Sequence, residues 1–185
     1  MKAKDDRKMS LPKFYLINEV VNVCSVVKYL GHFCTDDLSD DKDIARQCRK
    51  LYAQSNTLVR QFHMCTPDVK VNLFRTYCTP LYTAHLWFNY FKYSMTKLTV
   101  AYNDAMRFLL QVPRYLSASQ MFADLHIPVC QAVCRNLMYK FITRLGKSEN
   151  CIISCLVNPA HSDTVYNSKL WAHWRNQLYV CHVDG

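Results

Sequence analysis

Lysine and arginine side chains recur on one side of a predicted helix that spans about residues 40–62. Its polar side carries four cations, Arg46, Arg49, Lys50 and Arg60. Cations in a row on a helix can neutralise the phosphates of a nucleic-acid backbone and release its counterions without reading the bases. An ordinary solvated helix face has the same composition, and the helix taken alone favours that second interpretation.

Further cations follow on later predicted helices. The next helix carries Lys70 and Arg75, and a second, weaker set comprises Arg107, Arg114, Arg135, Lys140 and Arg144. The 185 residues hold 23 Lys and Arg against 14 Asp and Glu, a formal net charge of +9. Such a balance favours a polyanionic partner, with nucleic acid ahead of an anionic membrane surface. Simple solubility is the alternative explanation of the charge.

Ten cysteines and seven histidines raise the question of a zinc site or a nucleophilic thiol. Cys130 and Cys134 lie one helical turn apart, and Cys151, Cys155 and His161 form a second group. Zinc ligands usually come from knuckles or from closely spaced Cys and His pairs, whereas cysteines on an apolar helix face are commonly core residues. The core interpretation is favoured, and no cysteine lies on a recognisable catalytic turn. Because no export signal or membrane span is visible, we expect reduced thiols.

Aspartates gather before and within the first predicted helix: Asp36, Asp37, Asp40, Asp41 and Asp43. Two-metal phosphoryl transfer requires carboxylates that converge on both ions. Acids at the start of a helix are better explained as capping groups and as charges that oppose the helix dipole. The sequence therefore predicts no metal site and no cofactor for this chain.

The pattern of elements predicts a mainly α fold with a small N-terminal β element. Only three glycines and six prolines occur, which favours helices over a many-stranded sheet. Residues 13–17 and 20–24 are predicted to pair across a turn at Asn18-Glu19, and Val26 to Gly31 is predicted to be a buried third strand. Helices are predicted over about 40–62, 67–91 with a kink at Pro80, 94–112, a short stretch capped by Ser117 or Ser119, 129–145, 148–157 and 162–180.

Two apolar stripes at helical spacing are expected to form the core. The first comprises Ile44, Cys48, Leu51, Tyr52, Ser55, Leu58, Val59 and Phe62. The second comprises Leu98, Ala101, Tyr102, Ala105, Phe108, Leu109 and Val112. In the last segment, Tyr166, Leu170, Trp174, Leu178 and Trp171 are expected to point inward. The aromatic cluster Tyr77, Tyr82, Trp87, Phe88, Tyr90, Phe91 and Tyr93 can stack on bases, but its crowding around a kinked apolar helix favours a core role.

Several segments, in this order, resemble the C-terminal part of reverse transcriptases of non-LTR (LINE-type, jockey-like) retrotransposons. Val27–Gly31 is similar to the KYLG strand at the end of the palm of that family, and Asp43–Phe62 is similar to the helix that follows. One thumb helix of the family is similar to Leu73–Tyr82 with Leu86-Trp87. The next thumb helix and its connector are similar to Tyr102–Leu110, with Pro113-Arg114 and Ser117–Phe122. The likeness covers about residues 14–145 well and the rest of the chain more loosely.

The resemblance implies a domain order. It comprises a charged, solvated lead-in over 1–12, a β element from the end of the palm over 13–34, a helical thumb-like domain over 35–145 and a C-terminal helical extension over 146–185. The expected partner is an RNA/DNA template–primer duplex, held without sequence preference by Arg46, Arg49, Lys50, Arg60, Lys70, Arg75, Arg107 and Arg114. The missing palm and fingers are a further expected partner, and neither a membrane nor a small-molecule substrate is expected.

The metal-holding Y/F-x-D-D turn of the family has no counterpart upstream of Tyr29. A fragment of an RNA-directed DNA polymerase without its catalytic palm is therefore expected to be inactive alone, with Mg²⁺ needed only by the intact polymerase. An intracellular location is expected, nuclear or cytoplasmic being left open. The alternative function is a helical protein-interaction or scaffold module with no nucleic-acid role. In either case the strand that ends at Gly31 is expected to expose an open edge and an apolar patch, and so to promote self-association.

Overall fold

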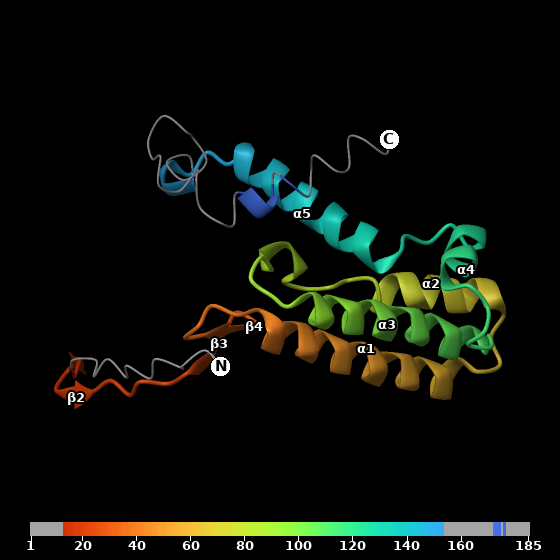
Figure 1. Cartoon of the computed structure of the whole chain (residues 1–185), viewed down its shortest axis with the longest axis horizontal. Helices are drawn as coiled ribbons and strands as arrows, with labels where there is room; N and C mark the ends of the chain where they lie inside the picture. Colours follow the sequence, from red (N-terminus) through yellow and green to blue (C-terminus); the bar gives the residue numbers. More distant parts are fainter. Residues whose placement is uncertain (1–12, 154–171, 175, 177–185) are drawn as a thin grey trace, which may run out of the picture.

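The computed structural model describes residues 13–153, 172–174 and 176, in which two short hairpins precede a series of helices (Figure 1). The mainly α fold class with a small N-terminal antiparallel β element is confirmed. The lead-in over 1–12 lies outside the described residues, as do the predicted inward positions Tyr166, Leu170, Trp171 and Leu178. Trp174 is described, and it is buried as predicted.

The β element consists of two separate hairpins, not the predicted three-stranded sheet. β1 (Tyr15–Leu16) pairs with β2 (Glu19–Val20), and β3 (Val26–Tyr29) pairs with β4 (His32–Thr35), both antiparallel. The first turn is Ile17-Asn18, where both residues have positive φ, and not Asn18-Glu19. Leu30 and Gly31 form the second two-residue turn with φ of 46° and 83°. Positive φ at both central residues suits the right-handed twist of hairpin strands, which explains the Gly.

These hairpins expose most of their apolar side chains. In Figure 1 the β1–β2 hairpin extends away from the helices. The exposed apolar residues of this arm, defined as residues 14–30, are Phe14, Tyr15, Leu16, Ile17, Val20, Val21, Val23, Val27, Tyr29 and Leu30. The prediction of a buried strand over Val26 to Gly31 is therefore wrong, because β3 pairs only with β4 and no further layer of the described residues covers it.

Two long helices form the body and lie side by side in Figure 1: α1 (Asp41–Phe62) and α3 (Lys92–Leu110). Most of both predicted stripes is buried at their interface, in agreement with the helical spacing. The buried members are Ile44, Leu51, Ser55, Leu58, Leu98, Ala101, Tyr102, Ala105 and Leu109. Tyr52 and Phe108 are exceptions, with exposed fractions of 36% and 38%, because each lies at the edge of its stripe.

α2 (Pro67–Tyr77) begins at Pro67, as predicted, but it ends before Pro80. Residues 78–91 are irregular apart from a single 3₁₀ turn, η1 (Ala84–Leu86), so the predicted kinked helix through Phe91 is wrong. Polar side chains of α1 and its N-cap hold this segment instead. Gln47 donates to the carbonyl of Tyr82 at 2.6 Å, and the Asp40 carboxylate accepts the backbone N–H groups of Phe88 and Asn89 at 2.9 Å. Tertiary hydrogen bonds therefore replace the helical ones that Pro80 interrupts.

The remaining helices are α4 (Ala118–Asp124) and α5 (Cys130–Gly146), close to the predicted bounds. Ser117 caps α4 by accepting the N–H of Gln120. An aromatic trio joins α2, α3 and α4: the Phe74 and Tyr102 ring centroids lie 5.0 Å apart, and those of Tyr102 and Phe122 lie 5.4 Å apart. The Tyr102 hydroxyl donates to the Pro128 carbonyl, which fixes the chain just before α5.

Candidate nucleic-acid interface

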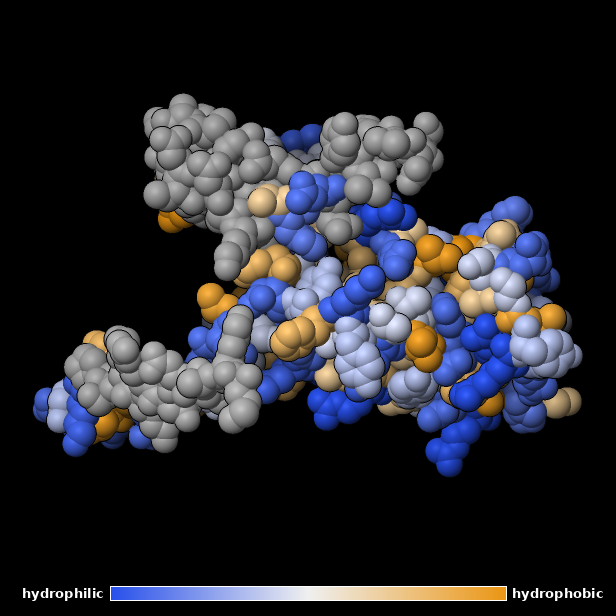
Figure 2. All heavy atoms as spheres, in the orientation of Figure 1, coloured by the Kyte–Doolittle hydropathy of each residue, from blue (hydrophilic) through white to orange (hydrophobic). Residues whose placement is uncertain are grey.

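Most of the exposed, unpaired cations of the candidate interface lie on the outer face of α1. Arg49, Lys50 and Arg60 are exposed, and none forms an ion pair with another described residue. Arg49 and Arg60 are eleven residues apart, which places them on nearly the same side of the helix about 16 Å apart along its axis. No acidic residue occurs on α1 after the buried Asp43. Figure 2 shows hydrophilic side chains along the lower edge, which α1 forms. This face is a row of uncompensated positive charge.

Arg46 does not belong to this row. Its Nε donates to Asp43 Oδ1 at 2.9 Å, and its side chain lies over the Phe33 ring. The side chain is only 22% exposed. The prediction that Arg46 faces solvent with the other three cations is wrong, because a buried carboxylate three residues earlier holds its guanidinium.

Asp43 lies in the first turn of α1, but it is buried and accepts hydrogen bonds from several elements, and we call it the buried hub. Its carboxylate is fully buried and accepts hydrogen bonds from the Thr83 hydroxyl and from Trp87 Nε1, the latter at 2.9 Å. His32 Nδ1 lies 3.1 Å from the same oxygen. Burial alone would raise the pKa of Asp43, but hydrogen bonds from Thr83, Trp87 and Arg46 outweigh it and lower the pKa below its ordinary value. The ionised hub therefore joins β4, α1 and the segment before α3.

Asp40 also links α1 to the segment before α3, but its pKa shifts in the opposite direction to that of Asp43. It is the N-cap residue of α1, but its side chain makes no capping hydrogen bond within that helix. It accepts instead from the backbone of Phe88 and Asn89. Burial raises the pKa of Asp40, and these hydrogen bonds only partly oppose the shift. Asp40 and Asp43 lie at the start of α1 as predicted, but their carboxylates also bond to residues 83–89, a role that the sequence did not indicate.

The two predicted cations on α2, Lys70 and Arg75, are buried or hydrogen-bonded within the fold. Lys70 is only 8% exposed. Arg75 is exposed, but its guanidinium donates to the carbonyls of Leu125 and His126 at 3.1 and 3.2 Å. These carbonyls follow the C-terminal end of α4, where cations satisfy unpaired acceptors. Lys70 and Arg75 therefore do not extend the exposed row of cations on α1.

Arg107 and Arg114 share a nearly buried carboxylate. Their side chains lie 3.6 and 3.5 Å from the oxygens of Asp104. Arg107 also donates to the carbonyl of Leu116, whereas the Arg114 side chain is 73% exposed. Arg114 is therefore much more accessible to an external anion than Arg107, whose side chain is 15% exposed, although Arg114 also donates to Asp104 Oδ2.

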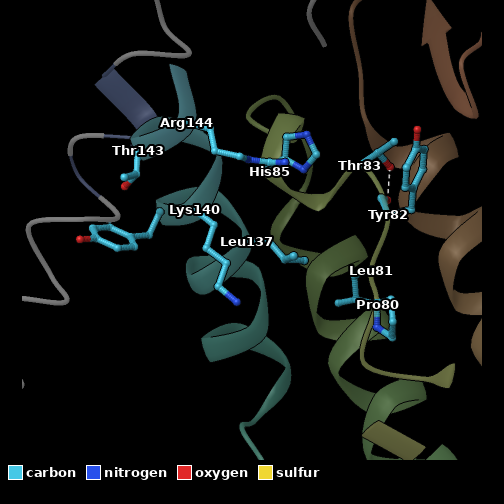
Figure 3. A pocket seen from close by; sticks show the side chains of 10 residues that line it. Pro80, Leu81, Tyr82, Thr83, His85, Leu137, Lys140, Thr143 and Arg144 are labelled. Atoms are coloured by element: carbon cyan, nitrogen blue, oxygen red, sulfur yellow. Dashed lines mark hydrogen bonds between the residues drawn. The ribbon is translucent and has the colours of Figure 1, made fainter. Parts of the chain in front are cut away.

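A separate hollow of about 600 Å³ lies between residues 80–85 and α5. Figure 3 shows Lys140 and Arg144 extending from α5 beside its apolar wall, with the Arg144 side chain directed at His85. Burial, with a further contribution from Arg144, lowers the pKa of His85, so its ring is neutral near pH 7. The cations of α5 therefore form a second positive region away from the row on α1.

Metal and thiol chemistry find no support in the described part of the chain. No cluster of three or more His, Cys, Asp or Glu residues occurs there in a metal-binding arrangement. Cys130 and Cys134 are buried on α5, and their mutual hydrogen bond together with burial raises the pKa of Cys130. Burial raises the pKa of Cys78 to about 11. The Cys130 and Cys78 thiols therefore remain protonated near neutral pH, and the burial of Cys130 and Cys134 agrees with the core interpretation. Cys155 and His161 lie outside the described residues.

The aromatic cluster is less buried than predicted. Trp87 is buried, but Tyr77, Tyr82, Phe91 and Tyr93 have exposed fractions between 50% and 75%. Tyr82 and Phe91 are exposed on the irregular segment that replaces the expected helix, and Tyr77 and Tyr93 are exposed at the end of α2 and in the first turn of α3. Trp174 Nε1 donates to the carbonyl of His85, a contact between distant segments that no local pattern could indicate.

Comparison with known proteins adds no relative: no protein-family model, curated protein or solved structure matches the chain. The resemblance to LINE-type reverse transcriptases accordingly stays a prediction. Among the helices within the described residues, none combines the length and hydropathy that crossing a membrane requires.

Proposed function

We propose that this chain binds the sugar–phosphate backbone of nucleic acid without sequence preference, through the exposed cations of α1. The observation that carries the proposal is the row of Arg49, Lys50 and Arg60 on a helix that has no acidic residue after Asp43, which is buried and paired. No neighbouring acid on the helix neutralises the row. Side-chain cations that contact the phosphate backbone supply affinity that does not depend on the sequence.

The resemblance to a reverse-transcriptase thumb supports the same proposal, since such a thumb is expected to grip a template–primer duplex. Of the eight cations that the resemblance assigns to the interface, the proposal retains Arg49, Lys50, Arg60 and Arg114. It leaves out Lys70, Arg75, Arg46 and Arg107, whose side chains are buried or bonded within the fold. The proposal assigns binding to the chain and no chemical step.

We expect affinity for duplex DNA or an RNA–DNA hybrid to depend steeply on salt. The three cations of α1, with one phosphate each, predict a slope of about −2.7 for log K against log salt concentration, or roughly a 40-fold loss between 50 and 200 mM, and a contact by Arg114 would steepen the slope by about 0.9. Fluorescence anisotropy with two duplexes of unrelated sequence measures both the slope and the sequence tolerance. Absence of binding at 50 mM salt, or strong preference for one sequence, would contradict the proposal.

The exposed arm of residues 14–30 favours the second candidate function, a protein-interaction module. Its ten large apolar side chains are exposed on two-stranded hairpins with open edges. Contiguous apolar surface of this kind marks protein contacts or causes aggregation. The two functions are compatible, because the arm and the row on α1 use different residues.

We expect the chain to self-associate through this arm despite its net charge of +9. Sedimentation velocity should show a concentration-dependent increase in mass for the wild type. Substituting Leu16→Ser and Leu30→Ser should reduce it, because 68% and 75% of these side chains are exposed. The control is Met64→Ser, an apolar residue after α1 that is even more exposed, at 86%, and this substitution should leave association unchanged. A wild type that stays monomeric at high concentration would contradict the expectation.

A further inference from the structure

A shallow apolar hollow of about 410 Å³ lies in the groove between α1 and α3. Cys48 and Tyr52 line it from α1. From α3 it is lined by Tyr93, Thr96, Lys97 and Val100, which recur at three- and four-residue spacing and so share one helix face. The hollow has a volume typical of small-ligand sites. Its position matters because it adjoins the basic row on α1.

Two tyrosines flank this hollow and remain accessible. Tyr93 is 67% exposed and Tyr52 is 36% exposed. Neither side chain has the deep burial of the core aromatics Phe74 and Tyr102. Burial raises the pKa of Cys48 and of Tyr52, so both groups are uncharged near neutral pH. The hollow therefore offers uncharged aromatic and aliphatic surface, which suits a flat apolar ring.

Positive charge surrounds this apolar surface. Lys97 Nζ lies 4.4 Å from the Tyr93 ring centroid. Arg49 is three residues before Tyr52 on α1, hence on an adjacent position of the helix surface. The acid that acts on Tyr52 is Asp104, which pairs with Arg107 and Arg114. An occupant with a flat ring and an attached negative group matches both features.

We propose that this hollow takes an unpaired nucleobase, which stacks on Tyr52 and Tyr93 while Lys97 and Arg49 contact the flanking phosphates. Aromatic side chains beside a basic groove bind single strands in this way, with little sequence preference. The inference rests on the proposed function and extends it: the chain prefers nucleic acid with unpaired bases, such as a single strand or an overhang, to a blunt duplex whose bases are stacked on one another.

The test compares three probes by fluorescence anisotropy: oligothymidine of about ten nucleotides, an abasic strand of the same length and charge, and a blunt DNA duplex. Oligothymidine and the abasic strand present the same phosphates, so their difference isolates the base. We expect wild type to bind oligothymidine roughly 5- to 150-fold more tightly than the abasic strand. Tyr93→Leu and Tyr52→Leu should each reduce this ratio, and Tyr93→Phe, which keeps the ring, should retain it.

Tyr115→Leu is the matched control, since Tyr115 is 86% exposed and lies outside the hollow. It should leave all three affinities unchanged. Equal wild-type affinity for oligothymidine and the abasic strand would overturn the inference, as would a ratio unchanged in both leucine variants. In either case salt-dependent binding to the duplex would leave the proposed function intact. Absence of binding to every probe at low salt would instead overturn the proposed function and this inference with it.

Discussion

Replacement of Asp43 by alanine is expected to lower the free energy of unfolding by about 3–5 kcal/mol, the usual cost of removing one partner from a buried, hydrogen-bonded charge pair. Four donors lose their acceptor together: the Arg46 guanidinium, the Trp87 indole N–H, the Thr83 hydroxyl and the Phe33 backbone N–H. His32 Nδ1 loses its neighbour on the same carboxylate. Since domains of this size are stable by only about 5–15 kcal/mol, the variant should unfold at much lower urea concentration.

Asp68→Ala is the matched control for this experiment. Asp68 also lies in the first turn of a helix, but it is exposed and accepts no side-chain hydrogen bond among those described. Loss of its interaction with the helix dipole should cost only about 0.3–1 kcal/mol. Equal losses in the two variants would show that Asp43 acts as a helix-end charge and not as a buried hub.

The same hub predicts a direction for the pH dependence of stability. The folded pKa of Asp43 lies below its ordinary value, so its stabilising contribution is complete above about pH 4. That contribution decreases as the pH falls through the lowered folded pKa. The wild-type free energy of unfolding should therefore fall below pH 4, and the Asp43→Ala variant should lose less stability over this acid range.

Phe74→Ala is the second substitution with a large expected effect. The Phe74 side chain is fully buried and packs edge-on against Tyr102 and beside Phe122. Removing a buried ring should cost about 3–5 kcal/mol, through lost burial and the cavity that remains. Phe91→Ala is the matched control because that ring is 75% exposed, and its loss should stay within about 0.5 kcal/mol. A loss below 1 kcal/mol for Phe74→Ala in urea unfolding would mean that the aromatic trio is not the core of this region.

Local patterns were sufficient to predict the helices whose stability depends on a buried stripe. Ile44, Leu51 and Leu58 recur at the spacing that places them on one face of α1, and they are buried there. Ser117 before α4 and Pro67 at the start of α2 likewise carry their signals within a few residues. These features needed no knowledge of distant contacts.

Residues 78–91 could not be predicted in the same way. Their conformation depends on Asp40 and Gln47, whose side chains bond to backbone atoms 35 to 49 residues away. An apolar sequence with one proline was compatible with a kinked helix until those partners were known. The partner strand β4 was missed because His32 to Thr35 is less regularly apolar than β3, although Leu30-Gly31 is a two-residue turn signal.

The candidate site, too, could be predicted only in part from local sequence patterns. Residue type and spacing identified a basic face on α1, and Arg49, Lys50 and Arg60 do lie exposed on it. An aspartate three residues earlier on the same helix holds each of Arg46 and Arg107, and this spacing could have separated them from the other three in the sequence. Only the Leu116 carbonyl, the second partner of Arg107, is placed by the fold. The tyrosine-lined hollow between α1 and α3 was missed because its two sides are 41 residues apart in sequence, from Tyr52 to Tyr93.

The most direct test of nucleic-acid binding by α1 is the salt slope of a charge variant. The variant carries Arg49→Gln, Lys50→Gln and Arg60→Gln. The control carries Lys28→Gln, Lys92→Gln and Lys147→Gln, which removes the same charge from exposed positions outside α1. On duplex DNA we expect the slope of log K against log salt to move toward zero by about 0.9 for each lost phosphate contact in the α1 variant, and to change little in the control. Equal changes in the two, or an unchanged slope in the α1 variant, would contradict binding through α1.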